Sequence, residues 1–142
     1  MKQIYRISIL VAISLIILGS YCIAGDSEKE KLALLAAQKW IMIVDEGKYT
    51  ESWTEAAEYF KNTVKQDQWE QALEAARKPL GKLISRKVSS TTYITSLPGD
   101  PYGQYVIVQF ETSFENKKSS IETVTPMMDK DKKWRVSGYY IK

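Results

Sequence analysis

The stretch that decides the fold is YVIVQFETSFE, residues 105–115, in which apolar and polar side chains alternate. Successive side chains of a β-strand point to opposite faces, so every second residue shares a face. That face carries Val106, Val108, Phe110, Thr112 and Phe114. Alternation of this kind is typical of an antiparallel sheet with one face on a core. The stretch therefore predicts a strand with its even-numbered residues turned inward.

Three more strands are expected around this one. They are predicted at residues 83–97, 119–128 and 134–141, separated by turn-forming residues at 97–103, 116–118 and 129–132. The segment 83–97 is rich in Ser, Thr, Val, Ile and Tyr, which favour strands, and its length indicates a bulge near Ser89 and Ser90. Pro126 indicates a bulged or edge-like end to the third strand.

Before Leu80 the apolar residues recur at helical spacing instead. Three helices are predicted, beginning at Ser27, near Thr50 or Ser52, and at Asp67. Each carries one tryptophan anchor, and the expected core aromatics are Trp40, Trp53, Phe60, Trp69, Phe110 and Phe114. Helices followed by a meander predict an α+β fold, with three N-terminal helices packed on one face of a four-stranded antiparallel sheet.

The N-terminus has the pattern of a secretory signal. Lys2 and Arg6 precede an apolar run over residues 7–19, and Cys22 and Ala24 are small residues at the −3 and −1 positions. We expect cleavage after Ala24, which leaves a single domain over residues 25–142 and places it in the periplasm or outside the cell. Lipid attachment at Cys22 is disfavoured because the preceding residue is Tyr21.

The alternative is an uncleaved anchor in the inner membrane through residues 7–24, a stretch of 18 residues that is just long enough to span. The protein would contact a membrane only in that case. The two readings of the N-terminus stay open at this point.

Composition removes several classes of function. The 142 residues hold no histidine and one cysteine, which argues against histidine-dependent catalysis, most metal sites and any internal disulfide. Lys and Arg number 20 against 17 Asp and Glu, so no concentrated positive charge favours a nucleic-acid partner. We expect no metal and no cofactor.

Short motifs along the chain carry a family resemblance. They are Trp40, Val44-Asp45, Gly47, Tyr49 and Ser52-Trp53, then Pro79-Leu80-Gly81, Ser85-Arg86 and Leu97-Pro98-Gly99, and finally Glu122-Thr123-Val124, Trp134, Val136 and Gly138-Tyr139. In these residues and their spacing the chain resembles a bacterial exported family known as domain of unknown function 4019. The resemblance implies a cystatin-like or nuclear-transport-factor-2-like roll, a curved sheet around a long helix with a cone-shaped cavity. It implies no activity, because such shapes host isomerases, dehydratases and pure binding modules.

Register arithmetic brings four polar residues together on the inner face. Pairing the second and third strands across residues 116–118 sets Thr112 opposite Glu122, and pairing the third and fourth across 129–132 sets Glu122 opposite Tyr139. Arg86 shares the face of Ile84 and Val88 on the first strand. Arg86, Thr112, Glu122 and Tyr139 are therefore the candidate ligand-binding residues, provided that no hairpin slips by one residue.

The cluster has two interpretations. Glu122 is a candidate general base assisted by Tyr139, because a desolvated carboxylate beside a phenol can exchange protons. Alternatively, Arg86 and Glu122 form an internal ion pair that fixes strand register. Asp45 and Glu46 are weaker candidates, because adjacent helix residues do not face each other. Arg77 and Lys78 are interpreted as cations that complement the end of the third helix.

Three functions follow from these patterns. The first is a non-enzymatic envelope module that binds a small molecule or an envelope protein. The second is a histidine-free isomerase or hydrolase that uses Glu122 with Tyr139. The third is an accessory protein anchored in the membrane by its N-terminus. The sequence makes no prediction of the oligomeric state.

Overall fold

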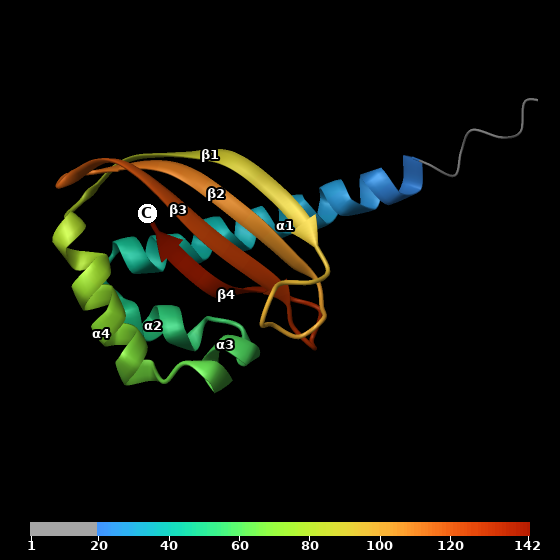
Figure 1. The fold of residues 1–142 in the computed structure, drawn as a ribbon, viewed down its shortest axis with the longest axis horizontal. Helices are drawn as coiled ribbons and strands as arrows, with labels where there is room; N and C mark the ends of the chain where they lie inside the picture. Colours follow the sequence, from blue (N-terminus) through green and yellow to red (C-terminus); the bar gives the residue numbers. More distant parts are fainter. Residues whose placement is uncertain (1–19) are drawn as a thin grey trace, which may run out of the picture.

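Helices from the N-terminal half cover one face of a curved sheet in the computed structural model, which describes residues 20–142 (Figure 1). The helices are α1 (Ser20–Asp45), α2 (Tyr49–Thr54), α3 (Glu58–Thr63) and α4 (Gln66–Ala76), followed by the 3-10 turn η1 (Lys78–Leu80). The strands are β1 (Leu83–Ile94), β2 (Tyr105–Phe114), β3 (Lys117–Met128) and β4 (Trp134–Ile141). The predicted α+β class, with helices on an antiparallel sheet, is confirmed.

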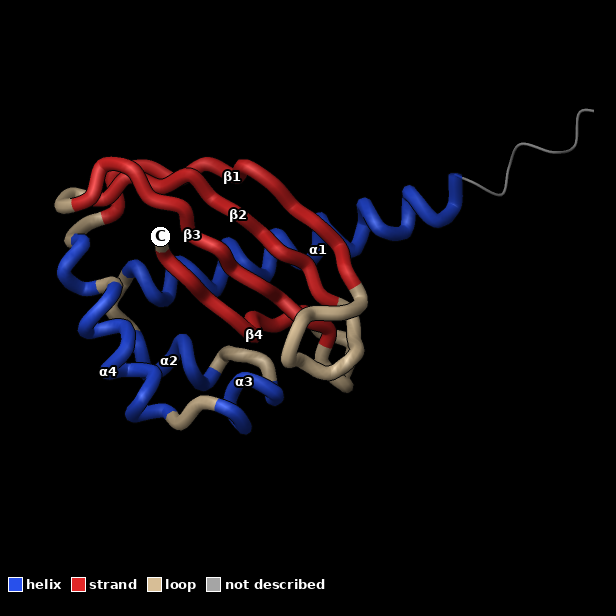
Figure 2. The backbone as a smooth tube through the Cα atoms, in the orientation of Figure 1, coloured by secondary structure: helices blue, strands red, loops and turns tan. Residues whose placement is uncertain are grey.

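The sheet is an open meander in the order β1-β2-β3-β4, with every neighbouring pair antiparallel (Figure 2). The predicted bulge in β1 is present as a register shift between Val88 and Ser90. Another shift lies between Thr125 and Pro126, which agrees with the distortion that the proline predicts. β1 ends at Ile94, three residues before the predicted Leu97.

The helix boundaries correct the sequence reading at three places. α1 begins at Ser20, so Ser27 lies within a helix and not at its start. α4 begins at Gln66 after an extended Lys65, and Asp67 does not cap it. The third correction concerns the second predicted helix, which divides into α2 and α3.

The division of that helix has a tertiary cause. Ala57 is extended (φ −59°, ψ 149°), and its backbone N–H donates to the carbonyl of Val136 on β4 at 2.8 Å. A continuous helix would direct that N–H to the carbonyl four residues earlier. Both Ala56 and Ala57 are fully buried, so the break lets the chain sit directly against β4.

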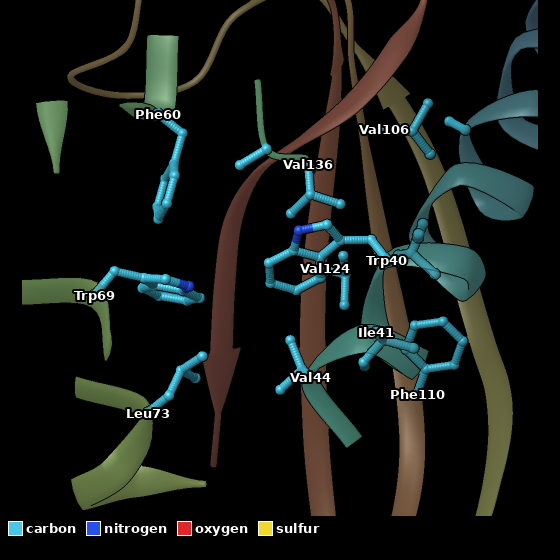
Figure 3. Packing of buried hydrophobic residues seen from close by; sticks show 14 of the residues in the cluster. Trp40, Ile41, Val44, Phe60, Trp69, Leu73, Val106, Phe110, Val124 and Val136 are labelled. Atoms are coloured by element: carbon cyan, nitrogen blue, oxygen red, sulfur yellow. The ribbon is translucent and has the colours of Figure 1, made fainter. Parts of the chain in front are cut away.

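The core lies between α1 and the concave face of the sheet, and α4 closes it from the side. Trp40 of α1 packs against Trp69 of α4 at 6.1 Å between ring centroids. Figure 3 shows Phe60 and Leu73 on either side of Trp69, with Val136 next to the indole of Trp40. Trp40, Phe60, Trp69, Phe110 and Phe114 are buried as predicted, whereas Trp53 is only partly buried because its indole sits at the rim of the cluster.

Where the family resemblance implies a cone-shaped cavity, the centre of the concave face is filled. The void among Trp40, Phe60, Trp69 and Tyr139 has no room for a water molecule. Three large aromatic rings from the helices fill the concavity that a cavity would need.

The predicted signal at residues 1–24 lies outside the described residues, apart from the helical backbone of residues 20–24. Among residues 20–142, no helix combines the length and the apolar character needed to cross a membrane.

Candidate functional site

Each strand of the sheet contributes one polar side chain to a cluster beneath the C-terminal end of α1. Arg86 comes from β1, Thr112 from β2, Glu122 from β3 and Tyr139 from β4. All four point to the concave face. Arg86, Thr112 and Glu122 each lie two residues from a core neighbour on the same strand. Tyr139 lies three residues from Val136, and the register shift between Gly138 and Val136 brings both onto that face. The sequence prediction that these four side chains gather inside is confirmed by their hydrogen bonds.

The pairing that brings them together differs from the prediction by two residues in both hairpins. Thr112 lies opposite Ser120, and Glu122 lies between Phe110 and Ile141. The β2–β3 turn is made by Glu115 and Asn116 alone, two positions that the prediction split between strand and turn. A slip of two residues preserves the face of every side chain, so Thr112 reaches Glu122 diagonally.

Glu122 is the centre of the cluster and is 0% exposed. Its Oε1 accepts hydrogen bonds from Arg86 Nε at 2.8 Å and from Thr112 Oγ1 at 2.6 Å. Its Oε2 accepts a hydrogen bond from the Tyr139 hydroxyl. Three donors on three other strands thus satisfy one buried carboxylate, which is the arrangement that makes burial of a charge tolerable.

Two further members of the cluster were not predicted from the sequence. Asp45, at the end of α1, accepts from Arg86 Nη1 at 2.6 Å and from Arg86 Nη2 at 2.9 Å. Arg77, which follows α4, donates to the same carboxylate at 3.2 Å and to the carbonyl of Gly81 at 2.7 Å. We call these six residues, Asp45, Arg77, Arg86, Thr112, Glu122 and Tyr139, the polar cluster.

The sequence carried a partial signal for both residues. Asp45 and Glu46 are the weaker candidates of the sequence, and Glu46 points elsewhere, to Lys48 at 2.8 Å. Arg77 was interpreted as a helix-end cation, although its side chain is only 4% exposed. Asp45 and Arg86 are 41 positions apart, so no local spacing could have paired them.

Burial and charge act together on the ionisable groups of the polar cluster. Burial opposes the charged form of Arg86, but its hydrogen bonds to Asp45 and Glu122 outweigh burial and raise the pKa of its guanidinium. Burial, followed by the negative charge of Glu122, raises the pKa of the Tyr139 phenol well above its ordinary value. Tyr139 therefore keeps its proton throughout the neutral range and acts as a hydrogen-bond donor.

The cluster is balanced in charge and closed to solvent at its centre. The two arginines offset the two carboxylates, and Phe110 and Phe114 lie under the guanidinium groups of Arg86 and Arg77. Arg86 borders a surface groove of about 380 Å³ between α1 and the sheet, and Glu122 does not line it. In residues 20–142, no group of three or more Cys, Asp or Glu side chains is placed to hold a metal ion. The arrangement suits a structural role, in which the polar cluster holds α1 and α4 to the sheet.

The fold and the cluster together define a small α+β domain whose sheet is held to its helices by a buried ionic network. The chain matches the model of the family described as "Protein of unknown function (DUF4019)" over residues 36–139, and it belongs to that family. The matched segment includes all six residues of the polar cluster. Neither the curated proteins nor the solved structures contain a match to this chain.

Proposed function

We propose that the protein is a non-enzymatic module of the bacterial envelope that binds a small ligand or a protein partner at its surface. The observation that carries this proposal is the complete burial of Glu122, the carboxylate best placed for proton transfer. Export is part of the proposal because of the apolar segment and small residues before Gly25.

The enzymatic alternative requires Glu122 to meet a substrate. A general base must come within hydrogen-bond reach of the proton that it removes. Both oxygens of Glu122 already accept hydrogen bonds from Arg86, Thr112 and Tyr139. The same geometry gives Glu122 a clear structural task, since an unpaired buried carboxylate would be costly. This supports a role at the surface and not at the polar cluster.

The test is a thermal-shift screen of a ligand library on two proteins, the wild type and the double variant Arg86→Met with Glu122→Gln. The double variant removes one positive and one negative charge from the interior and changes the surface only at the groove that Arg86 borders. For a surface-binding module, each ligand that raises the Tm of the wild type should raise that of the double variant by the same amount.

The opposite result would support catalysis. A compound whose stabilising effect depends on Glu122, or which is converted by the wild type and not by Glu122→Gln, would contradict the proposal. Tyr139→Phe serves as the second variant in that comparison, because it removes one hydrogen bond to Glu122 without removing a charge.

A further inference from the structure

An acidic groove lies where α2 and α4 pack together (Figure 1), close to Arg77 of the polar cluster. Its volume is about 630 Å³, within the range of small-ligand sites. Tyr49 and Thr50 line it from α2, and Asp67, Glu70 and Glu74 line it from α4.

The three carboxylates form a stripe along one face of α4. They lie at positions i, i+3 and i+7, where neighbouring like charges destabilise a helix by a few tenths of a kcal/mol per pair, roughly. Among the described residues, Glu74 is the member of the stripe that forms an ion pair, with Lys78 at 2.8 Å. The stripe therefore leaves negative charge on the groove without a matching internal cation.

Glu70 is held in position for a ligand. Its Oε1 accepts hydrogen bonds from Thr50 Oγ1 at 2.6 Å and from Gln66 Nε2 at 3.0 Å. Because both donors bond to Oε1, they fix the orientation of the side chain. Oε2 of Glu70 accepts no hydrogen bond from any residue within 20–142. A carboxylate ordered in advance loses less freedom when it binds a cation.

Tyr49 supplies an independent observation. Its side chain lines the groove although the residue is only 9% exposed, and its hydroxyl forms no hydrogen bond with any described residue. The hydroxyl is also not enclosed and opens toward the groove, where the charges of Arg77, Glu74 and Lys78 act on it. A buried phenol usually finds a partner, and here the free position faces the ligand space.

The spacing of the acceptors selects the class of ligand. Seven residues of helix span about 10 Å, so the three carboxylates are spread along α4 and cannot converge on one metal ion. From these observations, and on the basis of the proposed binding function, we infer that the groove binds a linear organic polycation of the polyamine type. Its ammonium groups would meet the carboxylates of Glu70 and Glu74 and the hydroxyl of Tyr49.

The experiment is isothermal titration calorimetry of the full-length protein with spermidine at low ionic strength. Wild type should bind saturably at one site. Glu70→Gln should weaken binding about tenfold, because it removes a charge-assisted hydrogen bond, and Tyr49→Phe should weaken it by roughly threefold. The matched control is Glu111→Gln, which removes one exposed negative charge from β2 and should leave the affinity unchanged.

Three results would overturn the inference. They are the absence of saturable binding, an equal loss in Glu70→Gln and Glu111→Gln, and binding of a lysine-rich peptide in place of spermidine. Circular dichroism checks the fold of each variant, and Asp67→Asn replaces Glu70→Gln if that variant does not fold. If spermidine does not bind but a library ligand still shifts the Tm, the inference about the groove is wrong and the proposed function stands. If no ligand shifts the Tm either, the proposed function fails as well.

Discussion

Arg86 joins the sheet to the helices with all three nitrogens of one side chain. Its Nε bonds to Glu122 of β3, and its two terminal nitrogens form a fork with Asp45 of α1. Such a planar fork matches a carboxylate in a way that a lysine cannot. Arg86, whose side chain is 10% exposed, thus links the end of α1 to the sheet.

Removal of this guanidinium should strongly destabilise the protein. Arg86→Met leaves Glu122 buried without a cation, which costs about 3–5 kcal/mol when one partner of a buried pair is lost. Adding Glu122→Gln should recover much of that loss, since Asp45 keeps its bond to Arg77. Denaturant unfolding of the two single variants and the double variant measures the coupling. Small, additive effects would mean that the pair is not buried in solution.

The exposed ion pair between Lys78 and Glu74 provides the matched control for the Arg86 and Glu122 variants. Both side chains are more than half exposed, at 67% and 51%, so water screens their attraction. Glu74→Gln should leave the unfolding midpoint nearly unchanged.

Tyr139 should make the protein sensitive to alkali. Burial, followed by the charge of Glu122, raises its pKa above the ordinary value of 10.0, so above that pH the unfolded chain releases a proton that the folded protein keeps. The contribution of this group to stability is therefore full below pH 10.0 and is lost as the pH rises. Each such proton lowers the free energy of unfolding by about 1.4 kcal/mol per pH unit.

Urea unfolding between about pH 9 and about pH 12 tests this expectation. The free energy of unfolding of Tyr139→Phe should fall less steeply with rising pH than that of the wild type. The difference in slope should correspond to the release of up to one proton. Tyr140→Phe is the control, because its side chain is 64% exposed on the other face of β4. Identical slopes for wild type and Tyr139→Phe would contradict the geometry around Glu122.

At the scale of elements, α4 stabilises the fold through a single large residue. Trp69 contacts Phe60 edge to face at 5.0 Å and Tyr139 at 6.5 Å. Its indole N–H donates to the buried hydroxyl of Ser52 at 2.9 Å. Trp69 therefore ties α4 to α2, α3 and β4 at once.

Trp69→Ala should cost about 3–5 kcal/mol, the usual loss for a buried aromatic residue. Trp53→Ala should cost less, since Trp53 is partly exposed and packs at the rim of the core. Thermal and denaturant unfolding of the two variants show which substitution causes the larger loss of stability. A larger loss at Trp53 would show that α2 is packed with its other face inward.

At the scale of the whole molecule, the body of the domain begins well after the predicted cleavage site. Figure 1 shows the N-terminal part of α1 extending beyond the sheet. Along the described chain, Ala33 is the first residue of the core, and residues 25–28 are exposed. Cleavage after Ala24 would therefore remove no described core contact.

We expect the protein recovered from the cell envelope to begin at Gly25 and to unfold with the same free energy as the full-length chain. N-terminal sequencing and intact mass identify the first residue. A full-length product in the membrane fraction would support the anchored alternative instead, and a lipid mass on Cys22 would support lipid attachment at that residue.

Much of this architecture follows from local patterns in the sequence. Alternation over residues 105–115 predicted β2 and its buried face, and β4 was predicted with the bounds that it has. The gathering of Arg86, Thr112, Glu122 and Tyr139 was also predictable, because side-chain direction in a strand has a period of two. Face assignment survives an error of two residues in register, and that is the error that occurred.

The tertiary structure alone decided where the helices meet the sheet. The break at Ala57 depends on a carbonyl of β4, which lies 79 positions further along the chain as Val136. Asp45 and Arg77 join the polar cluster because α1 and α4 end above the same patch of sheet. Hydrophobic periodicity specifies which side of an element is buried, but not how far the element slides along its partner. The ionic contacts at the end of α1 depend on that position along the sheet, to which the packing of Trp40 against Tyr139 of β4 also contributes.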